Sequence, residues 1–245
     1  MQRYKIVVSY DGTAYAGWQV QPNDVTIQAK LEAALNQLTS EKPKVHGSGR
    51  TDQGVHARHQ VAHFDLHRPF PVRSFPRALN SNLPGDIRVL RAAKADPAFD
   101  ARRHAVGKEY RYYIWNGEIL PPFHRHYRSH VKNRLQVGAM RQAAALLVGR
   151  HDFAAFTANS SREIETTVRE IYELSVAQRG FEITIRVRGS GFLYKMVRSL
   201  AGFLIRVGEG AVPPADAKAI LHSRVRTARV PTAPPQGLFL WNVSY

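Results

Sequence analysis

The stretch that organises this chain is GSGRTDQGVHA, residues 47–57. Its three glycines allow the backbone to turn tightly or to lie close against another molecule. Asp52 and Arg50 lie inside this frame, and a guanidinium within a few ångströms of a carboxylate favours the ionised acid. A charged carboxylate in a glycine-framed loop is suited to catalysis, although loop aspartates also cap turns through backbone amides.

The spacing in this loop excludes two nucleotide-binding motifs. A dinucleotide fingerprint would need glycine at the position of Asp52, and a P-loop would end in Gly-Lys-Ser/Thr where this loop has Gly54-Val55-His56. The residues that follow have a strand pattern, so no helix N-terminus is predicted there to receive a phosphate. Ser48 and Thr51 are weak candidates for a nucleophile, because no base stands at an identifying distance from them.

The composition restricts the class of protein. The 245 residues suffice for one large domain or two modest ones, each with its own core. The absence of cysteine excludes disulfides and thiolate metal sites, and no apolar run approaches the ~20 residues that cross a membrane. We therefore expect a soluble, cytoplasmic protein without a signal peptide. Lys and Arg number 35 against 19 Asp and Glu, a net charge of +16, which indicates a polyanionic partner such as nucleic acid.

The N-terminal part of the chain has the pattern of a small α+β fold. β-Branched and aromatic residues predict a strand over 3–10, helical spacing of apolar residues predicts a helix over 26–38, and alternation predicts a strand over 59–66. A weaker helix is predicted over 71–83, and another strand begins at Ile87. With a short strand entering the glycine loop, this gives the β-α-β-β-α-β order of ferredoxin-like folds, which many RNA-binding sheets share.

The C-terminal part repeats the α+β pattern loosely. Residues 1–97 and 98–245 are therefore expected to form two similar halves, with mixed, largely antiparallel sheets, flanking helices and an active-site cleft between them. In the second half we predict strands over 110–115, 168–176, 181–187 and 238–243, and helices over 135–148, 192–207 and 215–221.

The histidines at 56, 59, 63 and 67 raise the question of a metal site. On a strand, residues four apart lie ~13 Å from each other, too far to share one ion. The chain has no His-Glu-x-x-His motif and no thiol. We therefore predict no metal, and expect these histidines to form part of a polar or RNA-facing surface.

Two further segments carry residues of interest. Alternation places Tyr110, Tyr112 and Ile114 on one face of a strand, where most of these side chains are expected to be core. If a tyrosine on that face reaches a cleft, a base that has left the RNA helix could stack on its ring. Arg198 lies off the apolar stripe of its predicted helix, as a solvated arginine would.

The loop sequence GRTDQGVHA resembles the signature of the tRNA pseudouridine synthase A family, and seven further motifs agree in order along the chain. These are YDGT with YxGWQ (10–19), QVAHF (60–64), NLPGDI (82–87), YRY (110–112), GxHDF (149–153), FLxxMVR (192–198) and GLFL (237–240).

The resemblance implies a function and a role for five residues. Asp52 would be the catalytic carboxylate, Arg198 would pair with it, and Tyr110 would stack on the target uracil. Arg50 would contact RNA and Leu238 would line the uracil pocket. The family has the pseudouridine synthase fold and converts uridines at positions 38–40 of the tRNA anticodon arm, without a cofactor, as a homodimer.

Two other functions remain open from the residues alone. The charge and the strand order also suit a non-catalytic RNA-binding protein, and a metal-dependent nuclease is a weaker alternative. The sequence does not choose between attack of Asp52 on the sugar and removal of a sugar proton by Asp52, nor between the uridines that are modified.

Overall fold

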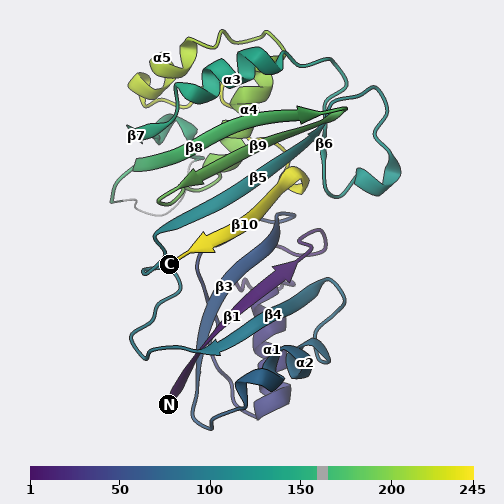
Figure 1. The fold of residues 1–245 in the computed structure, drawn as a ribbon, viewed down its shortest axis with the longest axis vertical. Coiled ribbons are helices and arrows are strands. Elements are labelled where there is room, and N and C mark those ends of the chain that lie inside the picture. Colours follow the sequence, from purple (N-terminus) through teal and green to yellow (C-terminus); the bar gives the residue numbers. More distant parts are fainter. Residues whose placement is uncertain (159–164) are drawn as a thin grey trace. The chain divides into compact units, whose positions relative to one another are not determined.

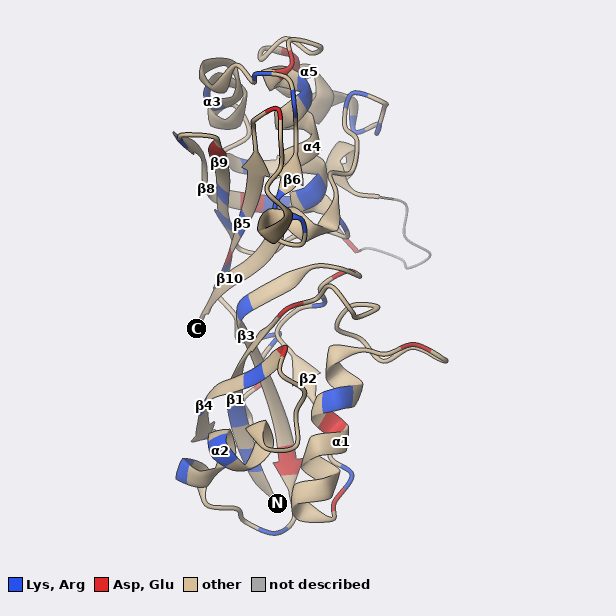
Figure 2. Ribbon diagram, turned by 90° about the vertical axis from the view of Figure 1, so that its right-hand side faces the viewer, with Lys and Arg blue, Asp and Glu red and all other residues tan. Residues whose placement is uncertain are grey.

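The structure, a computed structural model, describes residues 1–158 and 165–245. They form two compact units, residues 1–106 with 239–245 and residues 107–238. Each unit combines a largely antiparallel sheet with helices (Figure 1). The predicted α+β class is therefore confirmed. Figure 2 shows Lys and Arg on helices and strands of both units.

The first unit has the β-α-β-β-α-β order. In chain order its elements are β1 (Gln2–Tyr10), α1 (Ile27–Thr39), β2 (His46–Gly47), β3 (His56–Leu66), a 3-10 turn (Val72–Ser74), α2 (Phe75–Asn80), β4 (Ile87–Lys94) and, from the end of the chain, β10 (Leu238–Ser244). The strand order is β4-β1-β3 with antiparallel pairing. The short β2 pairs antiparallel with β3, and β10 runs parallel to the start of β3. Helices α1 and α2 lie on one side of this sheet (Figure 1).

The core of the first unit follows the predicted periodicities. Tyr4, Ile6 and Val8 alternate along β1 and are fully buried, as are Leu31 and Leu35 on α1. Burial of each such side chain contributes about 1.5–3 kcal/mol, which explains why strand and helix spacing predicted these elements well.

The predicted helix over 71–83 is too long. A 3-10 turn precedes α2, whose α-helical part covers only Phe75–Asn80. The Asn80 side chain accepts a hydrogen bond from the Val89 amide (2.8 Å) and donates one to the Val89 carbonyl (2.9 Å). These bonds fasten the end of the helix to β4, a tertiary contact that local periodicity does not reveal.

The prediction of an exposed histidine surface is wrong for His56 and His63. They are only 1% and 5% exposed, because the chain covers both faces of β3. The amide of Ala101 donates to Nδ1 of His63 (3.1 Å), and the His63 ring stacks on His46 with centroids 5.1 Å apart. Burial, together with the nearby His46 and Arg3, lowers the pKa of His63.

The second unit is built on a four-stranded antiparallel sheet in the order β5-β9-β8-β7. Its elements are β5 (Gly107–Trp115), β6 (Ser129–His130), α3 (Val137–Ala145), β7 (Gly149–Asp152), β8 (Val168–Arg179), β9 (Glu182–Gly189), α4 (Met196–Gly208) and α5 (Asp216–Ser223), with 3-10 turns at Pro122–His124, Ala154–Phe156 and Pro235–Gly237. The short β6 pairs parallel with β5. In α4, every residue except Arg198 and Arg206 is buried.

Helix α4 begins four residues later than predicted. Lys195, which precedes its first turn, has a φ of 56°, in the left-handed region that interrupts a right-handed helix. Phe192 instead packs its ring against the edge of Tyr110, with centroids 5.3 Å apart. Phe192 is therefore apolar because it packs against β5, and not because it belongs to the helix. In the described part of the chain, no helix has the length and hydropathy needed to span a membrane.

Candidate active site

The backbone on both sides of Asp52 is held by hydrogen bonds inside the first unit. The carbonyl of Thr51 accepts from the Trp18 amide (3.0 Å), and the carbonyl of Asp52 accepts from the Val55 amide (3.1 Å). The Thr51 hydroxyl forms a buried hydrogen bond with the Tyr10 hydroxyl (2.8 Å). Asp52 itself is partly exposed, so the loop presents a carboxylate from a fixed backbone.

The first part of the loop is fastened to β3. Ser48 is fully buried and its hydroxyl donates to Oε1 of Gln60 (2.6 Å), while Nε2 of Gln60 donates to the Gly49 carbonyl (2.7 Å). A Cβ on Gly47 would lie 2.6 Å from the Trp18 indole, which explains why glycine stands there. Ser48 therefore has a structural role, and its burial argues against a nucleophile.

Arg50 is the exposed cation of this loop. Its Nε donates to Oε1 of Gln19 (3.0 Å), a residue of the loop that follows β1. The guanidinium is thereby oriented at the surface, where a phosphate or a base edge is accessible to it.

Tyr110 lies on β5 in the second unit and is 8% exposed. It shares the buried face of this strand with Tyr112 and Ile114, as alternation predicted. Its ring contacts Phe192 edge to face, at an interplanar angle of 87°, the arrangement that aromatic quadrupoles favour. The tyrosine is thus held with a fixed ring plane.

The neighbouring Glu109 belongs to the opposite face of β5. Its carboxylate accepts from Arg111 Nε (2.9 Å) and from Arg186 Nη2 (3.0 Å). Burial would raise the pKa of Glu109, but these two arginines outweigh it and the pKa is lowered. Glu109 therefore forms ion pairs with these two arginines on the face of the sheet opposite to Tyr110.

Arg198 is in the first turn of α4 and is partly buried. Its Nε donates to the Ala233 carbonyl (2.8 Å), and the Ala233 amide donates to the Arg198 carbonyl (3.0 Å). A Cβ on Gly202, one turn along α4, would lie 2.0 Å from the Pro231 carbonyl oxygen. Glycine therefore lets the segment 231–233 lie against α4 and fix the arginine, so the expectation of a simply solvated Arg198 is wrong.

Leu238 is 5% exposed and directly follows the 3-10 turn Pro235–Gly237. The hydroxyl of the buried Tyr112 donates to the Pro234 carbonyl (2.9 Å) and anchors this turn. Tyr110 and Tyr112 lie on the same face of β5, and Tyr112 anchors the turn that precedes Leu238.

The structure places Asp52 and Arg50 in the first unit, and Tyr110, Arg198 and Leu238 in the second. Sequence reasoning missed four supporting residues: Trp18, Gln60, Gly202 and Ala233. Trp18 and Gln60 belong to motifs of the resemblance, whereas nothing in the pattern of α4 singles out Gly202. Among residues 1–158 and 165–245, no three His, Asp or Glu side chains gather as a metal site would require.

Comparisons with known proteins bear on the family. The sequence matches the family model described as "tRNA pseudouridine synthase" over residues 6–102 and 143–245. The chain belongs to the tRNA pseudouridine synthase family. The resemblance carried by the eight motifs is thereby confirmed, and the family is one of enzymes that isomerise uridine in tRNA.

Similar proteins agree along the whole chain. A tRNA pseudouridine synthase A of Exiguobacterium sp. strain AT1b is 48% identical, covering 100% of this chain and 98% of its own length. The tRNA pseudouridine synthase A of Bacillus subtilis strain 168 is 46% identical, with 99% of each chain covered. The solved archaeal box H/ACA sRNP Nop10-Cbf5 complex is a weak match, with TM-score 0.35 and 15% identity over 82% of this chain and 44% of that chain.

Proposed function

We propose that the chain isomerises uridine to pseudouridine at positions 38–40 of the tRNA anticodon arm, with Asp52 as the catalytic carboxylate. Membership of the family makes it an enzyme acting on tRNA. The observation that carries the assignment of Asp52 is its loop, in which Thr51 and Asp52 accept hydrogen bonds from Trp18 and Val55 while the Asp52 side chain stays partly exposed. Catalytic groups need this combination of a fixed backbone and access to substrate.

One carboxylate suffices for the reaction. The bond between uracil N1 and ribose C1′ breaks and a bond between C5 and C1′ forms, while the C5 proton passes to solvent and N1 takes up a proton from solvent. Glycoside hydrolases need two carboxylates because they activate water and protonate a leaving group. Here no water is added and the uracil stays in the site. Asp52 acts either by attacking C1′ or by removing a ribose proton, which expels the uracil.

The target nucleotide has to leave the base stack before Asp52 reaches its sugar. Flipping a nucleotide costs a few kcal/mol, and stacking of the uracil on Tyr110 would offset ~1–3 kcal/mol of that cost. We assign to Arg198 an ion pair with Asp52, to Leu238 the wall of the uracil pocket and to Arg50 a contact with the RNA. The anchoring of Arg198 at Ala233 and the edge contact of Phe192 on Tyr110 support these roles, because both side chains are held in place before substrate binds.

The proposal further takes the protein to be a cytoplasmic homodimer that works without cofactor or metal. The net charge of +16 supports binding of a tRNA through its phosphates. Twice the chain mass in light scattering, at concentrations used for assays, tests the dimer.

Two measurements test the function. tRNA carrying tritium at uridine C5 is incubated with the protein, and the pseudouridines are then mapped. The proposal predicts release of tritium and pseudouridine confined to positions 38–40. A non-catalytic RNA-binding protein would release none, a nuclease would cut the tRNA, and modification elsewhere in the tRNA would contradict the positional assignment.

A further inference from the structure

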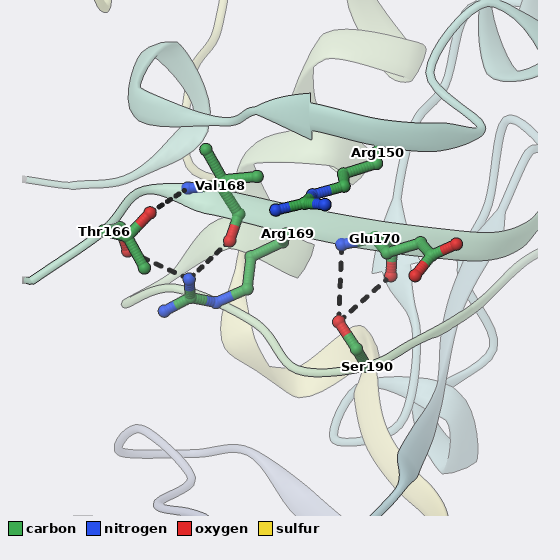
Figure 3. A pocket seen from close by; sticks show the side chains of 6 residues that line it. All are labelled: Arg150, Thr166, Val168, Arg169, Glu170 and Ser190. Atoms are coloured by element: carbon green, nitrogen blue, oxygen red, sulfur yellow. Dashed lines mark hydrogen bonds between the residues drawn. The ribbon is translucent and has the colours of Figure 1, made fainter.

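A small hollow lies at one end of the sheet in the second unit, and its lining does not include the residues assigned above. It has a volume of about 210 Å³ and is shown in Figure 3. Strands β7 and β8, the segment before β8 and the residue after β9 form it. Its lining consists of Arg150, Thr166, Val168, Arg169, Glu170 and Ser190.

One guanidinium of the hollow is oriented by the backbone. Nη1 of Arg169 donates to the carbonyls of Thr166 (2.9 Å) and Val168 (2.6 Å). These acceptors are neutral, so they fix the side chain without neutralising its charge. Partial burial of Arg169 lowers its pKa, and an arginine nevertheless stays protonated. The site therefore holds a cation in place without a counter-ion from this segment.

The second guanidinium is that of Arg150, on the edge strand β7. Arg150 is exposed and lies opposite Glu170 in the β7–β8 ladder. In Figure 3 the Glu170 carboxylate extends away from both guanidiniums. On the remaining side, the Ser190 hydroxyl accepts from the Glu170 amide (3.3 Å) and donates a long hydrogen bond to the Glu170 carbonyl (3.5 Å). Two arginines and a hydroxyl around one hollow match the chemistry of a phosphate.

The hollow lies at the same end of the sheet as Tyr110. Lys108, two residues before Tyr110, pairs with Gly189, and Gly189 pairs in turn with Ile171 on β8. Two strand spacings and two residues along a strand correspond to ~12 Å between the backbones of Tyr110 and Ile171, and the hollow begins one residue further along β8, at Glu170. Phe192 lies between Tyr110 and the hollow. Its ring contacts Tyr110 and lies 3.2 Å from the Cβ position of Gly189, the residue before Ser190. A single RNA strand whose base reaches Tyr110 is thus near the hollow.

We propose that Arg150, Arg169 and Ser190 bind a backbone phosphate of the tRNA strand that carries the target uridine. This inference rests on the proposed function, because it takes tRNA as the ligand. The contact contributes to affinity and position rather than to the chemical step, since no reacting atom lies in the hollow.

The test compares Arg150→Gln with Arg179→Gln. Arg179 is exposed at the far end of β8, so it provides the same loss of charge on the same sheet. For Arg150→Gln we expect the Kd for tRNA to rise several-fold, while kcat at saturating tRNA is unchanged. The slope of log Kd against log salt should fall by about 0.7–0.9, the value of one phosphate contact. Between 50 and 200 mM salt, the variant should then lose about threefold less affinity than the unmodified protein.

A second variant tests the sign of the charge effect. Glu170→Gln removes the one carboxylate that lines the hollow, so tRNA binding should tighten or stay equal. The proposal is overturned if Arg150→Gln and Arg179→Gln give the same Kd and salt slope. It is also overturned if inorganic phosphate binds in an Arg150-dependent manner while tRNA affinity is unaffected, since the hollow then serves a free anion. Failure of the unmodified protein to form pseudouridine would instead refute the proposed function, which separates the two results.

Discussion

Arg198 and Ala233 bind each other through two hydrogen bonds, from Arg198 Nε to the Ala233 carbonyl and from the Ala233 amide to the Arg198 carbonyl. The pair joins the first turn of α4 to a segment 35 residues later in the chain. One guanidinium nitrogen is therefore committed to the scaffold, which fixes the direction of the others. This suits an arginine that is to meet a carboxylate in one geometry.

Gly202→Ala should disturb this arrangement without touching a proposed catalytic group. The added Cβ would lie 2.0 Å from the Pro231 carbonyl oxygen, so the segment 231–233 must move. We expect a loss of about 1–3 kcal/mol in the free energy of unfolding and, because Arg198 shifts with Ala233, a fall in kcat of up to roughly 100-fold. Gly138→Ala on α3 is the control, since nothing lies within 4 Å of its Cβ. Equal kcat for the two variants would contradict the role of the Arg198–Ala233 pair.

Tyr10→Phe should reduce activity through the Asp52 loop. It removes the buried hydrogen bond to Thr51, the residue before Asp52, at a cost of about 1 kcal/mol in stability. The matched control is Tyr4→Phe on the same strand, whose hydroxyl bonds to Phe70 instead. Steady-state kinetics should show lower kcat for Tyr10→Phe and an unchanged kcat for Tyr4→Phe. A rate loss of the same size in both would mean that general stability, not loop position, limits turnover.

Tyr110→Leu tests whether the aromatic ring itself is needed, or only an apolar side chain of similar size. Leucine fills much of the same volume but offers no ring, so capture of the flipped uracil should fail while tRNA binding through phosphates persists. Tyr110→Phe keeps the ring and its edge contact with Phe192, and should retain most activity. Tritium release together with a tRNA binding assay measures both properties. If the leucine variant turns over as fast as the phenylalanine variant, Tyr110 does not stack on the base.

The sequence predicted those features that local patterns encode. Alternation located β1, β3 and β5 and the shared face of Tyr110, Tyr112 and Ile114. Helical spacing located α1 and most of α4, because burial of a stripe and the period of a helix coincide. The glycine-framed loop was recognisable from composition, and the motifs identified the family.

Long-range contacts explain what the sequence did not predict. The burial of His63 depends on a segment almost forty residues away, whose Ala101 amide bonds to the ring. The true start of α4 depends on Phe192 packing against β5. In the same way, the reason for glycine at 202 is the Pro231 carbonyl, which no periodicity brings near it. Each is a tertiary contact that overrides a local preference.

His63 should make stability depend on pH below neutrality. Its pKa is lowered in the folded state from an ordinary 6.5, so between the two values the unfolded chain binds more protons. The free energy of unfolding is therefore expected to hold above pH 6.5 and to fall as the pH drops below it. His63→Gln keeps an acceptor for the Ala101 amide but does not titrate, so urea unfolding across pH 5–7 should show a flatter profile. A profile as steep as that of the unmodified protein would assign the dependence to other groups.

The central claim is that the Asp52 carboxylate performs the reaction. The most direct measurement is tritium release from C5-labelled tRNA by Asp52→Asn, an almost isosteric change that removes the charge and leaves the loop hydrogen bonds from Trp18 and Val55 in place. We expect tRNA binding near that of the unmodified protein and no detectable release of tritium. Turnover by Asp52→Asn at a rate comparable to the unmodified protein would contradict the catalytic role of Asp52.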